Sequence, residues 1–123
     1  INDGDVIGRI DFQAPLEAGG TDAILVGAAI WAEADATFSA TVNSTDLVFA
    51  TGDSGAATEK LRIDSTGQAT FADGAIDVDI ASHDGTNGLK LGGTLVTATA
   101  ANLNDVVNQA TLGKTIAMVN IFG

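Results

Sequence analysis

The sequence has no cysteine and no tyrosine, and it contains only one proline, one tryptophan and one histidine. The absence of cysteine excludes disulfide bonds and cysteine metal sites. Basic residues are scarce as well, with 5 Lys and Arg against 16 Asp and Glu, so the net charge is −11. Because contact with phosphate needs cations, we expect no nucleic-acid partner. The longest apolar run, Ala23 to Ala32, is about half of the roughly 20 residues that a transmembrane helix needs. We therefore expect no membrane insertion.

The apolar residues that are present are small. Hydrophobic residues make up 46% of the chain, but much of this fraction is alanine, and aromatic residues account for only 5%. Each buried CH₂ contributes about 0.8 kcal/mol, so a core of Ala, Val and Gly supplies little stability per residue. The composition therefore predicts that neighbouring copies of the chain complete the core.

Apolar and polar residues alternate along several segments, which is typical of strands with two different faces. The alternation is clear in Val6–Ala14, Phe38–Val42, Leu61–Asp64 and Ile76–Ile80. Glycine-containing turn sequences separate these runs, and Ser65-Thr66-Gly67 predicts a short hairpin. We therefore predict a mainly β fold of short antiparallel strands and hairpins, intertwined or closely packed in a homo-oligomer.

Two segments depart from this pattern. Ala23–Ala34 is apolar on both faces and fits a buried strand or a buried helix, and its alternating neighbours favour a strand. Near the C-terminus, Thr99 is a candidate N-cap for a helix that ends at Gly113, and Lys114–Phe122 is predicted to form a final strand. We expect a strand-rich module over residues 1–73 and a strand–helix–strand module over residues 74–123, or one continuous domain.

Few residues point to chemistry. The single histidine, His83, stands beside a glycine-containing turn sequence without an evident catalytic partner, and a position in a surface loop is the favoured interpretation. The densest acidic group is Asp73, Asp77, Asp79 and Asp84, whose oxygen atoms could hold Ca²⁺. The spacing of an EF-hand is absent, and a solvated strand face is the simpler interpretation. We expect no cofactor and no enzymatic activity.

Several stretches resemble bacteriophage tail fibres and related virion appendages of the marine or cyanobacterial phage type. The stretch Ile7–Phe12, followed by Gly20–Ala23 leading into Val26–Ile30, is similar to a segment of these fibres. The stretches Ala36–Thr41, Thr45–Gly52 and Leu112–Met118 are similar to them as well. The stretch Thr58–Phe71 is similar to their E-x-x-R-I-x-x-x-G-x-V signature, and Leu95–Asn104 looks like a V-T-A-T-A-A-x-L-N element. The resemblance transfers no catalytic residue, because these motifs are structural in the family.

The resemblance implies a β-rich homotrimer on the outside of a virion, in which each chain contributes strands to a shared core. Other virion proteins and a host-surface glycan or receptor would be its partners. An alternative is an extracellular filament that polymerises by donation of a terminal strand, either Ile116–Phe122 or Val6–Phe12. The residues expected in the core between chains are Ile10, Phe12, Phe38, Val42, Leu47, Phe49, Leu61, Ile63, Phe71, Ile76, Val78, Ile80, Leu103, Val107, Ile116 and Met118.

Overall fold

The structure, a computed structural model, describes residues 1–16, 18–72 and 74–105. The chain divides into two compact units, Ile1–Ile76 and Asp77–Gly123. The first contains a five-stranded antiparallel sheet, and the second contains a two-stranded sheet and the start of a short helix. The prediction of a mainly β chain is confirmed.

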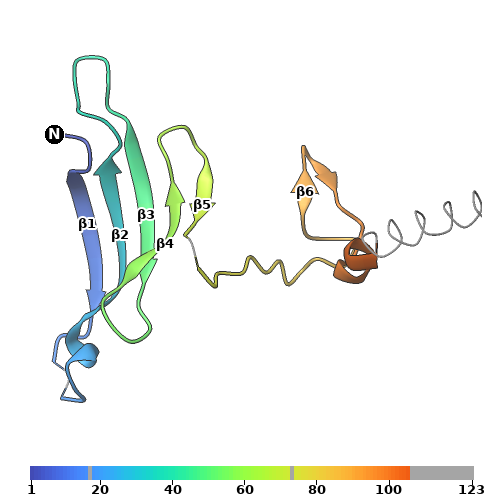
Figure 1. Ribbon diagram of the computed structural model, residues 1–123, viewed down its shortest axis with the longest axis horizontal. Coiled ribbons are helices and arrows are strands. Elements are labelled where there is room, and N and C mark those ends of the chain that lie inside the picture. Colours follow the sequence, from blue (N-terminus) through green and yellow to red (C-terminus); the bar gives the residue numbers. More distant parts are fainter. Residues whose placement is uncertain (17, 73, 106–123) are drawn as a thin grey trace, which may run out of the picture. The chain divides into compact units, whose positions relative to one another are not determined.

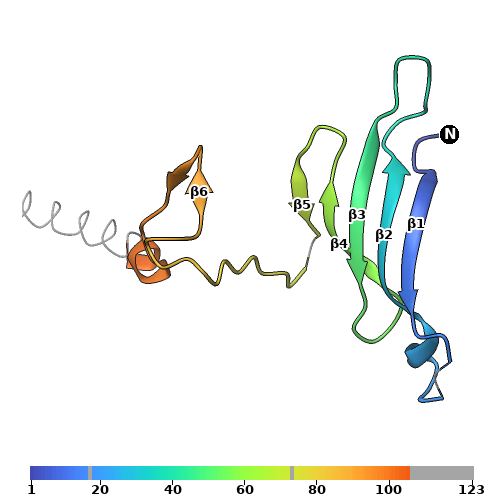
Figure 2. The ribbon, with the colours of Figure 1, turned by 180° about the vertical axis from the view of Figure 1, so that it is seen from behind.

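The first unit is a meander in which each strand pairs with the next along the chain (Figures 1 and 2). Its strands are β1 (Val6–Gln13), β2 (Val26–Ala34), β3 (Thr45–Thr51), β4 (Thr58–Ile63) and β5 (Ala69–Phe71). All four pairings are antiparallel. Among the described strands, β1 and β5 therefore form the two edges of the sheet.

Most of Ala23–Ala34, the segment that fits a strand or a helix by sequence, forms strand β2. A single 3₁₀ turn, Asp22–Ile24, precedes β2, which then runs as an interior strand between β1 and β3. Small residues on both sides of the strand explain why its alternation is weak. The preference for a strand over a helix is thus confirmed.

The predicted hairpin at Ser65-Thr66-Gly67 is also confirmed, because it connects β4 to β5. The carboxylate of Asp64 closes this turn by accepting the backbone N–H groups of Thr66 at 2.9 Å and Gln68 at 3.0 Å. Gly67 has a φ of 88°, a conformation that residues with a side chain rarely adopt. Local turn chemistry therefore fixes the register of the last two strands.

The expected strand over Phe38–Val42 is not formed. This segment belongs to the connection between β2 and β3, where Ser39 donates its N–H to the carbonyl of Val42 at 2.9 Å. That bond folds the segment back on itself. Strands β2 and β3 pair directly with each other, and Phe38–Val42 lies in the link between them. The alternating residues of this link therefore have no neighbouring strand with which to form a ladder of hydrogen bonds.

The expected strand over Ile76–Ile80 is not formed either. No strand is assigned there, and the side chains of Val78 and Ile80 are 60% and 38% exposed. A strand needs a partner for its backbone groups, and no described strand pairs with this segment. The side chains of Ile76–Ile80 do alternate between apolar and polar, but alternation alone does not show whether a partner strand is present.

The second unit contains a hairpin that the sequence analysis missed, formed by β6 (Lys90–Leu91) and β7 (Thr94–Leu95). Its turn is Gly92-Gly93, with φ angles of 56° and 81°, as tight two-residue hairpins require. A helix begins at residue 100. The hydroxyl of Thr99 accepts the N–H of Asn102 at 3.3 Å, which confirms the predicted N-cap. Outside the described residues lie the expected helix end at Gly113, the strand Lys114–Phe122, and the core candidates Val107, Ile116 and Met118.

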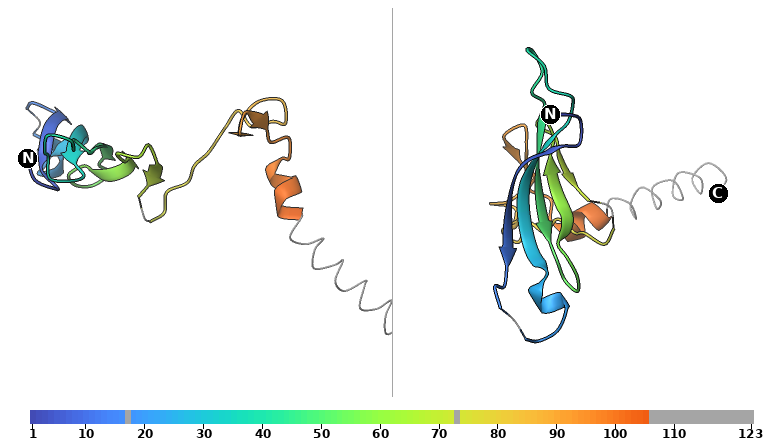
Figure 3. Two further views of the ribbon diagram at one scale, coloured as in Figure 1. Left: turned by 90° about the horizontal axis from the view of Figure 1, so that it is seen from above. Right: turned by 90° about the vertical axis from the view of Figure 1, so that its left-hand side faces the viewer.

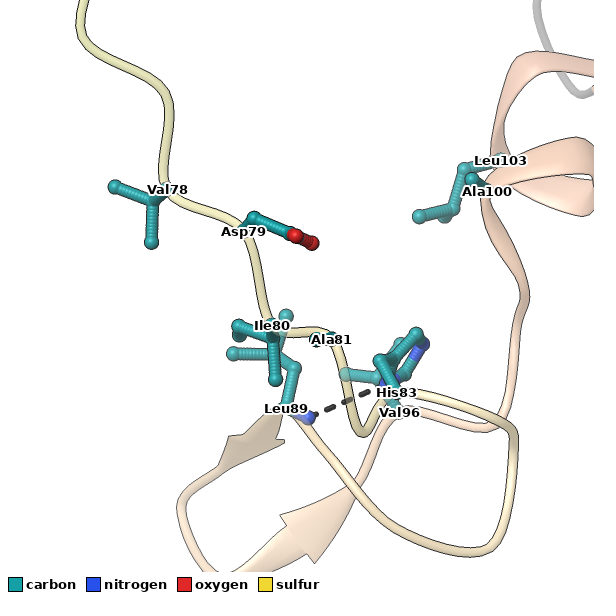
Figure 4. A pocket seen from close by; sticks show the side chains of 9 residues that line it. All are labelled: Val78, Asp79, Ile80, Ala81, His83, Leu89, Val96, Ala100 and Leu103. Atoms are coloured by element: carbon teal, nitrogen blue, oxygen red, sulfur yellow. Dashed lines mark hydrogen bonds between the residues drawn. The ribbon is translucent and has the colours of Figure 1, made fainter.

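His83 connects three segments of the second unit (Figure 4). Its Nε2 donates to the carbonyl of Ala98 at 2.8 Å, just before the helix. Its Nδ1 accepts the N–H of Leu89 at 3.2 Å, just before β6. The ring also fills the space beside Gly88, where an added Cβ would lie 2.5 Å from Nδ1. His83 is therefore a structural residue in this unit.

We expect Gly88→Ala to disturb the second unit more than Gly93→Ala. Both glycines have a positive φ, so both substitutions carry backbone strain of about 1 kcal/mol. Only Gly88 faces the imidazole of His83, which adds an overpacking cost of about 1–3 kcal/mol. Hydrogen exchange of the Leu89 amide measures the effect, and equal exchange rates in the two variants would contradict it.

Candidate functional site

One face of the five-stranded sheet is apolar across all five strands. Residues directly opposite each other in an antiparallel pair share a face, so the register assigns each side chain to one side. The central row runs from Ile10 on β1 to Phe71 on β5. The register also places Ala34, Thr45, Thr51 and Thr58 on this side, towards the ends of the strands. We call the remaining surface the apolar face; it consists of Gly8, Ile10, Phe12, Ala28, Ile30, Ala32, Leu47, Phe49, Leu61, Ile63, Ala69 and Phe71.

The apolar face is open to solvent. Ile10 is 60% exposed, Phe12 54%, Phe71 47% and Leu47 40%. Within residues 1–16 and 18–72 the sheet is a single layer, with no helix or second sheet packed on it (Figure 3). A sheet ordinarily buries its apolar face against another layer. A continuous exposed apolar surface of this kind marks an interaction site.

Seven of the predicted core residues lie together on the apolar face, and none of the predicted core residues that the structure describes is buried within the chain. Phe38 and Val42 lie in the β2–β3 connection, and Ile76, Val78, Ile80 and Leu103 lie beyond the sheet. The sequence analysis missed Ile30, at the centre of the face, because both sides of β2 are apolar. The seven are Ile10, Phe12, Leu47, Phe49, Leu61, Ile63 and Phe71.

The opposite face of the sheet is built differently. Its buried residues are small, with Ala29 and Ala50 almost inaccessible and Val48 at 0% exposure. Val48 lies opposite Trp31 on β2 and Arg62 on β4. Long side chains with polar ends can cover small apolar neighbours while their polar groups stay in water. This face therefore needs no further layer.

Arg62 holds the polar face together by binding carboxylates from three strands. Its guanidinium lies 2.6 Å from Asp46 on β3 and 3.0 Å from Glu33 on β2. It also makes two bonds to Glu59 on β4, at 3.0 and 2.8 Å. Asp46 is buried and accepts a further hydrogen bond from the N–H of Ser65 at 3.0 Å. These bonds join the interior strands on one side of the sheet.

A β-bulge makes this network possible. Residues three apart in a regular strand point to opposite faces, yet Glu59 and Arg62 bind each other. The register between β3 and β4 shifts between Phe49 and Ala50, which brings Glu59 to the same face as Arg62. Hydrogen bonding from Arg62 lowers the pKa of Glu59, and the carboxylates raise the pKa of Arg62. The charges of Arg62 and its three carboxylate partners are thus used within the chain.

The second unit has a pocket of about 360 Å³ (Figure 4). Its lining is mostly apolar and includes Val78, Ile80, Leu89 and Leu103. The titratable groups in the lining are Asp79 and His83. Both ring nitrogens of His83 are already hydrogen-bonded to backbone groups, so the imidazole has no free nitrogen for proton transfer. The pocket offers apolar contact and no evident chemistry.

The acidic residues considered for a cation do not form a common site. Asp84 accepts the N–H groups of Thr86 and Asn87, at 2.8 and 2.7 Å, and so closes its own turn. Asp77 is exposed, Asp79 lines the pocket, and Asp73 lies outside the described residues. In residues 1–16, 18–72 and 74–105, no three metal-binding side chains come together. Nor does this described part contain a helix long and apolar enough to cross a membrane.

No protein-family model, curated protein or solved structure matches this chain. The geometry of its surfaces is therefore the basis for assigning a role. Within residues 1–16 and 18–72, no other element packs on the apolar face, and this open surface is the feature that points to a role.

We expect Arg62→Met to lower the free energy of unfolding by about 1–3 kcal/mol, because it leaves the buried carboxylate of Asp46 without its cation. Arg9→Met is the matched control. Arg9 pairs with Asp11 and stacks on Trp31 at an exposed position, so its loss costs at most about 1 kcal/mol. Chemical denaturation measures both variants, and equal losses would contradict the structural role of Arg62.

A pH dependence follows from Asp64, whose pKa is lowered by hydrogen bonds from Thr66 and Gln68. A carboxyl group with a lowered folded-state pKa stabilises the fold above its ordinary value of 3.8, and this contribution is lost as the pH falls through the folded-state pKa. The stability difference between the wild type and Asp64→Asn should therefore shrink below pH 3.8. Urea denaturation at a series of pH values measures it, and a constant difference would show that the charge contributes nothing.

Proposed function

We propose that this chain is a non-enzymatic structural module of a viral fibre or other virion appendage, and that three copies assemble by burying their apolar faces against one another. The observation that carries the proposal is the single-layer sheet, whose apolar face has no cover within its own unit. A second layer made of identical chains supplies the missing core.

The distribution of charge favours a copy of the same chain as the occupant. The chain carries a net charge of −11, so two copies repel each other over most of their surface. None of the twelve residues that define the apolar face is charged, and the nearby Lys60, at the bulge of β4, binds the hydroxyl of Thr58. The exposed members of the face are large side chains such as Ile10, Phe12 and Phe71. Contact at this face therefore gains hydrophobic burial without placing carboxylates opposite each other.

The resemblance to tail fibres is the reason for proposing a virion appendage as the place of this module. Three of the resembling stretches, Ile7–Phe12, Thr45–Gly52 and Thr58–Phe71, largely coincide with β1, β3 and the β4–β5 hairpin. They contribute to both faces of one sheet. A structural part in a virion appendage fits such motifs, with other virion proteins and a host-surface glycan or receptor as further partners.

The strand-donation alternative is less well supported. One of its candidate donors, Val6–Phe12, already lies in β1 and pairs with β2 in its own sheet. Donation of this segment would break that ladder before a new one could form. The other candidate, Ile116–Phe122, lies outside the described residues. We therefore prefer assembly through a folded sheet.

The test is a pair of substitutions at adjacent positions of β5, which lie on opposite faces. Phe71→Glu places a charge on the apolar face, whereas Thr70→Glu places the same charge on the polar face. We expect the wild type and Thr70→Glu to assemble in threes, with a mass that is three times the 12.3-kDa mass of the chain or a multiple of that value. Loss of a buried Phe contact, about 1.5–3 kcal/mol, should weaken assembly of Phe71→Glu by roughly ten- to a hundredfold or more.

Analytical ultracentrifugation over a range of concentrations measures this mass. Thermal unfolding of the wild type should also depend on concentration, because folding and association are coupled. A wild-type chain that stays monomeric, or equal effects of the two substitutions, would overturn the proposed assembly.

A further inference from the structure

The outer edge of β1 is a second surface that the proposed assembly through the apolar face leaves unused. β1 is first in the strand order, and among the described strands it pairs with β2 alone. All eight of its residues are exposed. An open edge of this length presents a row of backbone N–H and C=O groups that another strand can pair with.

We propose that two copies of the chain pair along β1 as antiparallel strands, about a two-fold axis at Ile10. This contact goes beyond the proposed function and does not depend on it. It joins two sheets edge to edge and extends the apolar face across both copies.

The two faces of β1 limit the registers that such a pair can adopt. Opposite residues in an antiparallel pair share a face, and Gly8, Ile10 and Phe12 belong to the apolar face. Only registers that place even-numbered residues opposite even-numbered residues keep the two apolar faces together. A slip by one residue would put Arg9 or Asp11 among the apolar side chains, at a large desolvation cost.

Among the registers that remain, the one with its axis at Ile10 is the register that places the opposite charges of β1 directly across from each other. β1 carries one cation, Arg9, and one anion, Asp11, on its polar face, and within a single chain these two form an exposed ion pair at 2.6 Å, which the second copy would extend into a cluster of four charges. With the axis at Ile10, each Arg9 lies opposite Asp11 of the second copy, and two ion pairs form by symmetry. Moving the axis to Arg9 places the two arginines opposite each other, and moving it to Asp11 does the same for the two carboxylates. Like charges directly opposite in a sheet are destabilising.

Shape agrees with charge in the same register. The two-fold axis at Ile10 places Gly8 opposite Phe12 of the second copy. A Cβ added to Gly8 would have no atom within 4 Å, so the space above this residue is open. The ring of Phe12, 54% exposed in a single chain, fits across the glycine of the other strand. Pairing of an aromatic ring with a glycine across a strand is a known stabilising device in sheets.

Charge-swap variants test the contact, and the full chain carrying Phe71→Glu is the background, so that association through the apolar face is removed. In this background we expect a dimer by analytical ultracentrifugation. Arg9→Asp places four carboxylates, in two cross-strand pairs, near one axis, and Asp11→Arg does the same with cations. Each single variant should weaken dimerisation by about tenfold or more.

Two combinations should restore the dimer. A chain with both Arg9→Asp and Asp11→Arg again presents opposite charges across the axis. A mixture of the two single variants does so as well, because one chain then supplies two anions and the other two cations. Lys90→Asp, at an exposed position of β6, matches the charge change of Arg9→Asp and should leave dimerisation unchanged.

A disulfide tests the register directly, since the chain has no cysteine of its own. The axis brings the two Ile10 Cα atoms to about 4.5–5.5 Å, within the range that a disulfide spans. Ile10→Cys should therefore form a covalent dimer under mild oxidation. Ile30→Cys, one strand further in, would lie about 14 Å from its counterpart and should not.

A Phe71→Glu chain that stays monomeric, a mixture that does not restore association, or equal crosslinking at positions 10 and 30 would each overturn the edge contact. None of these results bears on the apolar face. Conversely, if Phe71→Glu did not weaken the wild-type assembly, the proposed function would be overturned. The β1 contact would stand in that case, because the charge-swap variants change only β1 and still test it.

Discussion

A single-layer sheet exposes both of its faces to water, and only a face with polar groups can form hydrogen bonds with water. This constraint governs the first unit of the chain. On one side, Arg62 binds Asp46, Glu33 and Glu59 and thereby joins three strands beneath a cover of polar side chains. On the other side, the row from Ile10 to Phe71 has no such cover within the unit. Because polar side chains cover only one of the two faces, the apolar face is the surface that remains open.

The distribution of side-chain size follows from the same constraint. Small residues such as Ala29, Val48 and Ala50 are buried on the polar face, where long neighbours can extend over them. The large apolar residues stand on the opposite face, where Ile10, Phe12 and Phe71 are exposed and Ile30, Phe49 and Leu61 are only half-buried. A stable monomer would be expected to bury its large residues first, since burial of apolar area is the main stabilising contribution. The reversed order is what a shared core between chains predicts.

The sequence was sufficient to predict some of the strands and one hairpin. It was not sufficient to predict which alternating segments would pair with another strand. Alternation in β1 and β4 and the turn at Ser65–Gly67 are local signals, and the strands and hairpin formed as expected. Phe38–Val42 and Ile76–Ile80 alternate equally well but form no strand, because pairing depends on partners elsewhere in the chain. The contact of Arg62 with Glu59 was hidden for a related reason. A bulge between β3 and β4 changes the face of one residue, and the alternation pattern carries no sign of it.

Faces and edges also differ in how they can close an assembly. Packing of apolar faces has no fixed direction, because hydrophobic burial depends on area and not on the alignment of particular groups. Pairing of edges is directional, since each backbone hydrogen bond and each Arg9–Asp11 contact needs one register. A symmetric pair at β1 uses up both edges and ends growth there, whereas an unpaired edge stays open to any strand that arrives. The opposite charges on either side of Ile10 therefore limit the partners of this edge, while the excess of carboxylates elsewhere keeps other surfaces apart.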